Sequence, residues 1–327
     1  MRAAIVDEFG PLEAIRIGET PAPELKPGHL LIAVKAAGVG FVDVLGAQGK
    51  YQVKQTLPFV PGSEYAGIVE AVGEGVTAIA PGERVMAGGF AGAYADYALA
   101  PAGAVLAMPA AMSFVEAAGF RTNYATALHA LADRAAITPG ESLLVLGAGG
   151  GTGLAAIQIG KLLGARVIAA ASSAQKRAAA LAAGADEAVD YVDPAWREAL
   201  KSMTGGKGVD VVFDPVGGAA TEAAFRSLAW KGRHLVIGFA AGTIPALPIN
   251  LALLKGASLV GVDIARFGNL YEPGKAAANV RQLLAWYAEG RLKPVAPQVL
   301  PFEKAAEALA AVANRRAVGK LVLSLED

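Results

Sequence analysis

Residues 145–158 read VLGAGGGTGLAAIQ, and five of these fourteen residues are glycine. Ordering a glycine costs more backbone entropy than ordering any other residue, so such a cluster needs a structural reason. The apolar run SLLVL before it predicts a strand, and the residues after it predict a helix. Ala148, Gly150 and Gly153 have the G-x-G-x-x-G spacing with alanine in the first place. Between a strand and a helix, this spacing indicates a dinucleotide-binding turn.

The glycines of this turn have separate expected tasks. Gly150 and Gly151 would let backbone N–H groups reach a pyrophosphate, and Gly153 would let the helix pack closely on the strand. Thr152 falls in the first helical turn, where the helix N-terminus carries partial positive charge that favours phosphate. The other interpretation is a glycine-rich loop that only turns the chain.

The end of the next expected strand decides which dinucleotide is favoured. It reads AAASSAQKR at 169–177 and contains no acid, whereas an acid there would bind the ribose 2′-hydroxyl of NAD and repel a 2′-phosphate. Ser172 and Ser173 can donate hydrogen bonds, and Lys176 and Arg177 bring positive charge. The sequence therefore favours NADPH over NADH. The alternative is that Lys176 is a solvated lysine in the first turn of a helix.

Outside this region the pattern changes along the chain. In the first third, short β-branched segments separated by Pro-Gly pairs at 27–28, 61–62 and 81–82 predict a mostly antiparallel β domain. Strands and helices alternate after residue 142, which predicts a parallel, doubly wound sheet. Two amphipathic helices, at 280–292 and 302–316, and a final strand at 319–325 complete an α/β chain.

Composition excludes several classes of protein. The 327 residues include 29 Lys+Arg and 29 Asp+Glu, so no basic excess points to nucleic acid or a membrane surface. There is no cysteine, which excludes disulfides, thiolate zinc sites and a cysteine nucleophile. The opening MRAAIVDEFG lacks an apolar stretch of signal-peptide length, and no apolar run reaches the roughly 18–20 residues of a spanning helix. We therefore expect a cytoplasmic location.

Several motifs together resemble the zinc-independent NADPH:quinone oxidoreductases of the medium-chain dehydrogenase/reductase superfamily. They are LPFVPGSEYAGIVEAVGEGV, PGERV, NYATALHAL, AGGGTG, GADEAVDY, FDPVGG and GKLVLSL, and they extend over nearly the whole chain. The resemblance implies a GroES-like catalytic domain formed by 1–121 and 263–327. A Rossmann NADPH-binding domain of 122–262 would be inserted in it, with the active site in the cleft between them.

The resemblance also implies that no zinc is bound. Relatives that oxidise alcohols hold catalytic zinc with Cys and His, and the equivalent positions here look like Gly40 and Ser63, neither of which is a ligand for it. The histidines, His29, His129 and His234, are far apart in the sequence and have no metal-ligand spacing. We expect His129, on an apolar helix, to be a satisfied core or cleft-edge histidine and not an acid or base.

Gly40 is a departure from the family. Members usually have Asn there, in N-x-x-D, and its amide faces the nicotinamide; this chain keeps Asp43 but not the amide. The implied pocket wall is roomier and less polar. Tyr51 resembles a tyrosine that lines the substrate cleft, and Thr126 resembles the contact to the nicotinamide carboxamide. The candidate catalytic residues are therefore Gly40, Asp43, Tyr51 and Thr126.

Further cofactor contacts follow from the same resemblance. Tyr191 would lie beside the adenosine ribose, and Gly238 and Phe239 where the backbone meets the nicotinamide. Arg315 would be a second phosphate cation, with Arg316 an equally good candidate, while we interpret Asp214 as a turn residue that caps the next helix. The candidate cofactor-binding residues are Thr126, Ala148, Gly150, Gly151, Thr152, Gly153, Ser172, Ser173, Lys176, Tyr191, Gly238, Phe239 and Arg315.

The implied reaction is hydride transfer from NADPH to a small-molecule acceptor, a quinone or a similar conjugated carbonyl. A quinone that accepts hydride leaves a stabilised anion, so no dedicated acid is required. The alternatives are an enone or enoyl-thioester reductase and a non-catalytic NADPH-binding protein. The resemblance further implies a homodimer in which edge strands of the two Rossmann sheets pair, with 258–267 as the candidate edge.

Overall fold

The computed structural model describes residues 1–326, and the chain divides into two compact units. Unit 1 consists of Met1–Thr122 and the residues from Ala296 onward, and unit 2 is Asn123–Val295. The first division lies one residue from the boundary expected after residue 121.

The second division lies after Val295, whereas the sequence placed it after residue 262. The intervening segment belongs with unit 2 because it packs there. The Phe267 ring stacks on His129 with centroids 3.7 Å apart, and Lys275 Nζ lies 3.1 Å from Asp133 Oδ1. Neither contact follows from periodicity or from a motif.

Unit 1 is built on a seven-stranded sheet in the order β14-β15-β3-β4-β5-β7, with β6 also pairing β3. All of its pairs are antiparallel except β14 with β15, as the first third of the sequence predicts. A second, two-stranded sheet joins β1 to β2. The strands are β1 (Arg2–Ile5), β2 (Arg16–Glu19), β3 (His29–Val39), β4 (Glu64–Val72), β5 (Arg84–Gly88), β6 (Tyr97–Pro101), β7 (Val105–Ala107), β14 (Gln298–Pro301) and β15 (Leu321–Ser324).

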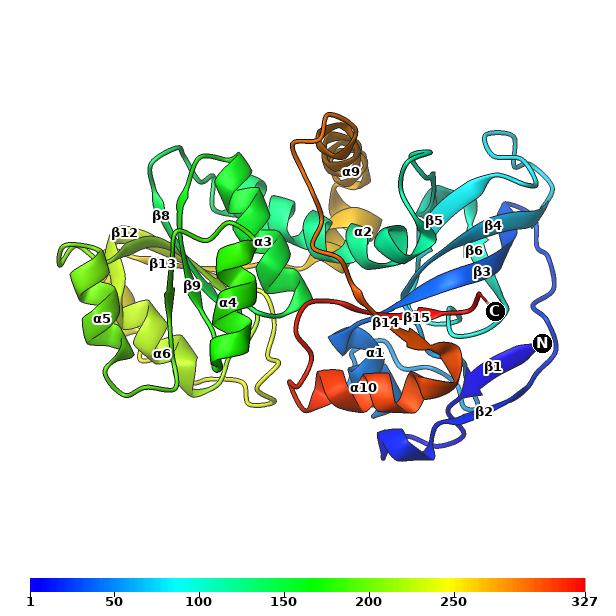
Figure 1. Ribbon diagram of the computed structural model, residues 1–327, viewed down its shortest axis with the longest axis horizontal. Coiled ribbons are helices and arrows are strands. Elements are labelled where there is room, and N and C mark those ends of the chain that lie inside the picture. The colour runs from blue at the N-terminus through cyan, green and yellow to red at the C-terminus, as the bar shows by residue number, and fades with distance from the viewer. Residues whose placement is uncertain (327) are drawn as a thin grey trace. The chain divides into compact units, whose positions relative to one another are not determined.

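Alternation along β3 explains how this sheet buries one face. In its first half every second residue is buried, including Leu30, Ile32 and Val34, which is the period-2 pattern of a half-buried strand. These side chains join a core completed by α1 (Phe41–Ala47) and α10 (Ala305–Ala313), which lie side by side in Figure 1. Short 3₁₀ turns are η1 (Leu12–Ala14), η2 (Ala102–Ala104) and η5 (Phe302–Lys304).

Unit 2 contains a six-stranded, wholly parallel sheet in the order β10-β9-β8-β11-β12-β13. This is the doubly wound Rossmann order, in which the chain reverses direction across the sheet between β8 and β11. The predicted α/β class is thus confirmed. The strands are β8 (Ser142–Leu146), β9 (Arg166–Ala170), β10 (Glu187–Val189), β11 (Val209–Asp214), β12 (Leu228–Val236) and β13 (Ser258–Gly261).

Helices cover both faces of this sheet. Figure 1 shows α3 and α4 on one side, and α5 and α6 on the other. The core on the second side joins residues of α5, α6 and α7 to alternate residues of β8 and β9, such as Leu144 and Ile168. The helices are α3 (Gly151–Leu162), α4 (Ala174–Ala182), α5 (Trp196–Met203), α6 (Ala219–Arg226), α7 (Asn250–Lys255), α8 (Ile264–Arg266) and α9 (Pro273–Ala288), with a π-helical turn η4 (Phe267–Tyr271).

The helix α2 (Phe114–Leu128) runs across the division between the units. It begins with a capping box: Ser113 Oγ accepts from the Glu116 N–H at 3.2 Å, and Glu116 Oε2 accepts from the Ser113 N–H at 2.9 Å. Directly after α2 the chain widens into a π-helical turn, η3 (His129–Arg134). Among residues 1–326, no helix has both the length and the apolar composition needed to cross a bilayer.

Candidate functional site

The glycine turn lies where the sequence places it, between β8 and α3. A side chain at Gly153 would collide with the Gly147 carbonyl oxygen and lie 2.8 Å from the Ala148 Cα, so only glycine lets the helix approach the strand so closely. A Cβ at Gly150 would meet only the Gly147 oxygen, at an ordinary 3.5 Å. Gly150 N-caps α3, and the N–H groups of the first helical turn have no partner within the helix. The turn therefore fits a phosphate.

Thr152 also connects α3 to α2 through a hydrogen bond. Its hydroxyl donates to Asn123 Oδ1 on α2 at 2.9 Å, and Asn123 is buried. The next residue of α2, Tyr124, donates its hydroxyl proton to Gln158 Oε1, further along α3, at 2.6 Å. These bonds fix α3 against the part of α2 that carries the buried Thr126. The sequence analysis did not identify Asn123, because its partner Thr152 lies 29 positions away and no local pattern links the two residues.

The loop after β9 combines an exposed serine with a capping serine. Ser172 is exposed, and Ser173 N-caps α4 by accepting from the Lys176 N–H at 3.3 Å. A hydroxyl that accepts in this way still has its own proton to donate. The stem of Lys176 lies against the glycine turn, because a Cβ built on Gly149 would fall 2.6 Å from the Lys176 Cγ. The structure thus brings the expected pyrophosphate and ribose loops together.

The two cations of this loop differ in their partners. Arg177 Nη1 lies 2.6 Å from Asp190 Oδ2 and donates to the Ala171 carbonyl oxygen at 3.2 Å, so its charge is offset within unit 2. Tyr191 follows Asp190 and packs against the core on the α5–α7 side of the sheet. Of the two cations, Lys176 is the one that contacts the glycine turn.

The loop after β11 meets the glycine turn at the point where the strand order reverses. A Cβ at Gly147 would lie 2.8 Å from Val216 Cγ2, so these two loops touch. The buried Asp214 holds the second loop: its Oδ1 accepts from the Val216 and Gly217 N–H groups at 2.9 and 2.8 Å. Asp214 is therefore a turn-forming residue, as the sequence indicates, but it does not cap the next helix, because the N-cap of α6 is Gly218. Ligands bind at such a reversal in open α/β sheets.

Asp214 also receives two side chains through its other oxygen. Thr221 Oγ1 donates to Oδ2 at 2.7 Å, and His234 Nε2 lies 3.0 Å from it. Burial alone would raise the pKa of Asp214, but the contacts from His234, Gly217 and Thr221 outweigh it, and the pKa falls below 3.8. The carboxylate is thus a fixed anion within the loop.

Gly238 and Phe239 follow β12, separated from its end by one residue, at the same edge of the sheet. The Ile237 N–H donates to the Asp214 carbonyl oxygen at 2.9 Å, which ties this segment to the end of β11. Phe239 lies over Gly217, whose Cβ would be 2.9 Å from the Phe239 ring. The sequence predicts that several candidate residues of unit 2 lie in loops. Each of these loops follows the carboxyl end of a strand, and the strands are neighbours in the sheet.

In unit 1, Gly40 and Asp43 form the start of α1. Asp43 is 3% exposed, and its Oδ2 accepts from the Gly40 N–H at 2.8 Å and from the Tyr94 hydroxyl at 3.0 Å. Its Oδ1 has no hydrogen-bond partner among residues 1–326. Burial raises the pKa of Asp43 above 3.8, although nearby Ser63, Gly40 and Lys320 oppose the rise. Tyr94 was not identified from the sequence.

The other unit 1 candidates lie on turns. Tyr51 is half-buried, with its ring centroid 6.4 Å from that of Phe90. Arg315 follows α10, is exposed and has a left-handed φ of 54°, a helix-ending conformation more typical of glycine or asparagine.

His129, in unit 2, is a buried histidine, as expected, and its Nδ1 lies 2.9 Å from Asp133 Oδ2.

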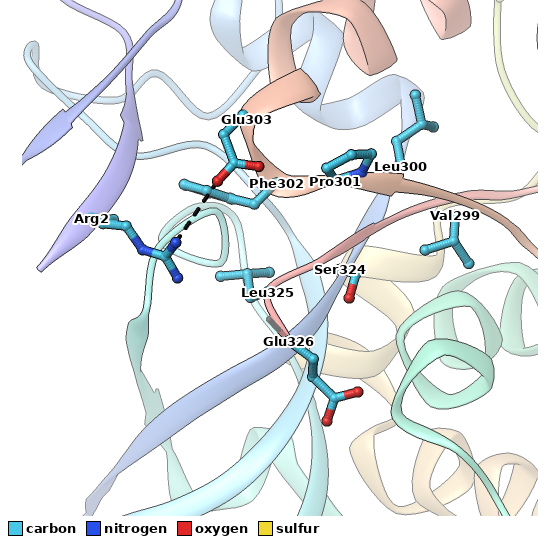
Figure 2. Close-up of a pocket in the computed structure, with 9 residues that line it drawn as sticks. All are labelled: Arg2, Val299, Leu300, Pro301, Phe302, Glu303, Ser324, Leu325 and Glu326. Carbon is cyan, nitrogen blue, oxygen red and sulfur yellow. Dashed lines mark ion pairs between the residues drawn. The ribbon is translucent and has the colours of Figure 1, made fainter.

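A hollow of about 330 Å³ in unit 1 contains none of the predicted site residues. Figure 2 shows it beside β14 and β15, with Glu303 facing Arg2 across 3.8 Å. Its lining carries two carboxylates, Glu303 and Glu326, and one arginine already engaged by Glu303. We see no reactive group in it.

Comparisons with known proteins agree with this geometry. Residues 26–110 match the alcohol dehydrogenase GroES-like domain, and residues 151–283 match the zinc-binding dehydrogenase family. The chain is 38% identical over 309 residues to quinone oxidoreductase-like protein 2 of Bos taurus, covering 94% of this chain and 88% of that protein.

Two solved structures are similar to this chain over 99% of its residues and over 100% of theirs. A mycobacterial protein complexed with NADPH superposes with a TM-score of 0.92 at 32% identity. Escherichia coli quinone oxidoreductase complexed with NADPH superposes with a TM-score of 0.91 at 29% identity.

The chain belongs to the quinone oxidoreductase family of the medium-chain dehydrogenase/reductase superfamily. It is an oxidoreductase by this membership. The family's GroES-like and Rossmann folds correspond to units 1 and 2.

The matched dehydrogenase family is named for zinc binding, but the described residues of this chain do not fit a zinc site. The described residues contain no group of three or more His, Cys, Asp or Glu side chains placed to hold a metal ion. The positions that resemble the catalytic ligands of zinc-dependent members are Gly40, which offers only backbone, and Ser63, a hydroxyl. No step of the reaction is therefore assigned to zinc.

Proposed function

We propose that this oxidoreductase uses NADPH to reduce a quinone or a similar conjugated carbonyl acceptor without zinc. The observation that carries the cofactor assignment is the contact of the Lys176 stem with Gly149, in a loop without an acid. That contact puts an ammonium group within reach of an anion bound beside the glycine turn. The 2′-phosphate is the anion that distinguishes NADPH from NADH.

The remaining residues are assigned to binding and orientation. The N-terminus of α3 would take the pyrophosphate, and Ser172, Ser173 and Lys176 the 2′-phosphate. Tyr191 would flank the adenosine ribose, and Arg315 would add a second cation at the phosphate. Thr126, Gly238 and Phe239 would hold the nicotinamide, the group that supplies the hydride. Gly40, Asp43 and Tyr51 would shape the acceptor side, with Asp43 positioning Gly40 through its N–H.

Cofactor binding is tested by two substitutions in unit 2. Lys176→Ala should weaken NADPH about tenfold, which corresponds to about 1.4 kcal/mol, and leave NADH nearly unchanged. The NADPH loss should shrink as salt rises, because an exposed charge pair is screened. Fluorescence titration at two ionic strengths measures both, with Lys293→Ala as the control for an exposed lysine. An equal loss for both dinucleotides would contradict a 2′-phosphate role.

The turn itself is tested by a matched pair of glycines. Gly150→Val should abolish NADPH binding with little change in stability, because its backbone is extended and its Cβ has room. Gly153→Val should instead destabilise the fold, because its Cβ collides with the Gly147 carbonyl. Normal NADPH binding by Gly150→Val would mean that the turn does not hold the phosphate.

Acceptor class is tested by following NADPH oxidation at 340 nm with quinones and enones in the presence of a strong chelator. The expected result is turnover of quinones that chelation does not change. Preference for enones would favour an enone or enoyl-thioester reductase, and binding without turnover would favour a non-catalytic protein. Activity that is lost on chelation and restored by zinc would overturn the proposal.

We also propose a homodimer that associates through β13. This strand is the edge of the unit 2 sheet, and large apolar side chains on or beside it are exposed, including Leu259 at 53% and Trp230 at 68%. Exposed apolar edges of this kind are rare in monomers. Light scattering should give twice the chain mass, and Leu259→Lys should shift it to the monomer mass. A monomeric wild type would contradict the proposal.

A further inference from the structure

A second hollow, of about 320 Å³, lies in unit 2 and is lined by basic side chains. The cations come from four different places in the chain: α5, the turn that follows it, and the ends of α6 and α7. They are Arg197, Lys201, Lys207, Arg226 and Lys255. Because the whole chain has no net charge, a general basic excess does not explain five cations around one hollow.

Three of these five cations have no side-chain partner among the described residues. Within residues 1–326, the side-chain nitrogens of Arg197, Lys201 and Lys207 make no ion pair and donate no hydrogen bond, and Lys201 accepts from the Thr204 hydroxyl only through its backbone carbonyl. Arg226 is paired with Glu222 at 2.7 Å, and Lys255 donates to the Leu228 carbonyl oxygen at 2.7 Å. The only carboxylate in the lining is Glu198.

Helix dipoles account for part of the cluster but not for all of it. The helices α5, α6 and α7 each carry one of these cations in the last turn, where a cation stabilises the helix dipole. At about half a charge per helix end, three ends offset about one and a half positive charges. Glu198 and Glu222 offset two more. A surplus of roughly one and a half positive charges remains at the hollow.

The repulsion between neighbouring cations lowers the pKa of one of them. Burial and the neighbouring charge of Arg197 lower the pKa of Lys255 below 10.5. A bound anion would reverse the effect of Arg197. The wall opposite these helices is a tight turn with left-handed glycines, and at Gly208 a side chain would come within 2.6 Å of the Ser227 carbonyl oxygen.

We infer that this hollow is a binding site for a small polyanion of the polyphosphate class, separate from the dinucleotide turn. The three unpartnered cations supply charge-assisted hydrogen bonds, which are about twice as strong as neutral ones. The lining contains no aromatic side chain on which a nucleobase could stack, so the recognised part is the chain of phosphates alone. A site of this kind would give the oxidoreductase a ligand other than its acceptor and its cofactor.

The test uses sodium tripolyphosphate and the full-length protein in low salt, measured by isothermal titration calorimetry. We compare the wild type with the triple variant Arg197→Gln, Lys201→Gln, Lys207→Gln. A second triple variant, Lys26→Gln, Arg281→Gln, Lys293→Gln, removes the same charge from exposed positions elsewhere. Melting temperatures of both variants should match the wild type, because all six side chains are on the surface.

The expected result is saturable binding to the wild type and the control variant, weakened at least tenfold in the hollow variant. NADPH affinity should be equal in all three proteins, which separates this site from the glycine turn. Absence of saturable binding, or an equal loss in both variants, would overturn the inference. A third outcome would also overturn it: the wild type binds phosphatidylserine vesicles, the hollow variant alone loses that binding, and tripolyphosphate gives no heat of binding with any of the proteins. That result would assign the cations to a membrane surface.

Discussion

Among the described residues each unit holds one buried aspartate, Asp43 in the first turn of α1 and Asp214 at the end of β11, and the two behave in opposite ways. Asp43 in unit 1 and Asp214 in unit 2 are both 3% exposed. Burial raises the pKa of Asp43, whereas the contacts of Asp214 overcome burial and lower its pKa. The difference lies in the partners and not in the depth of burial.

The partners can be compared atom by atom. Both oxygens of Asp214 are engaged, by two backbone N–H groups on one side and by Thr221 and His234 on the other. Only one oxygen of Asp43 receives hydrogen bonds, from Gly40 and Tyr94. A buried carboxylate is stable as an anion when its donors replace the lost water. Asp214 meets that condition and Asp43 does not.

The largest expected effect is the difference in stability between two variants, in which either Asp214 or Asp43 is replaced by asparagine. Asp214→Asn puts an NH₂ group where Thr221 and His234 now meet an oxygen, and should cost about 3 kcal/mol of unfolding free energy. Asp43→Asn keeps an oxygen for Gly40 and Tyr94 and removes a poorly compensated charge. It should change stability by no more than about 1 kcal/mol. Urea denaturation measures both, and each variant is the control for the other. Equal losses would show that burial alone governs these sites.

A smaller effect should appear in the pH dependence of stability. The folded pKa of Asp43 lies above 3.8, so the folded state binds its proton more tightly, and the contribution of Asp43 to stability declines as pH rises through that pKa. Asp43→Asn removes this decline. The stability of the variant relative to wild type should therefore improve as pH rises above about 4.

Asp214 predicts the reverse trend. Its folded pKa lies below 3.8, so its stabilisation is complete above that value and is lost as pH falls through the folded pKa. The deficit of Asp214→Asn should therefore shrink as pH falls below about 4. Urea titrations at several pH values give both slopes, and slopes of the same sign would contradict the comparison.

The two units also differ in how far the sequence determines them. In unit 2, the strand–glycine–helix pattern at 142–162 and the alternation after it were enough to predict a parallel sheet and the loops at its carboxyl edge. That is possible because these signals are local: each loop directly follows its own strand. Gly153, Ser173 and Asp214 were assigned from neighbouring residues, and the structure gives them local partners.

What the sequence could not supply are contacts between distant segments. Tyr94 reaches Asp43 over 51 positions, and Asn123 meets Thr152 over 29. The boundary at Val295, in place of 262, depends on Phe267 and Lys275 packing near the η3 turn. No period or spacing encodes such pairs, so the surroundings of Asp43 were the least predictable part of the candidate site.

The smallest expected effect on the fold comes from Gly40→Asn, which places an amide beside Asp43. The backbone at Gly40 is extended, with φ −123° and ψ 161°, so asparagine can adopt it without strain. Its Cβ would lie 3.3 Å from Asp43 Oδ2, so the carboxyl group must move by a few tenths of an ångström. Asparagine is also a good N-cap, and stability should change by only a few tenths of a kcal/mol.

Function should respond to this substitution more than stability does. The amide narrows the acceptor side and adds a polar group there, so the ratio of quinone to bulky-enone turnover should change while NADPH affinity stays within about twofold, or about 0.4 kcal/mol. Gly46→Asn, on the same helix and with open space around it, is the matched control and should leave the ratio unchanged. Identical ratios in Gly40→Asn and wild type would mean that Gly40 does not contact the acceptor, and Asp43 would then be a structural cap with no part in choosing it.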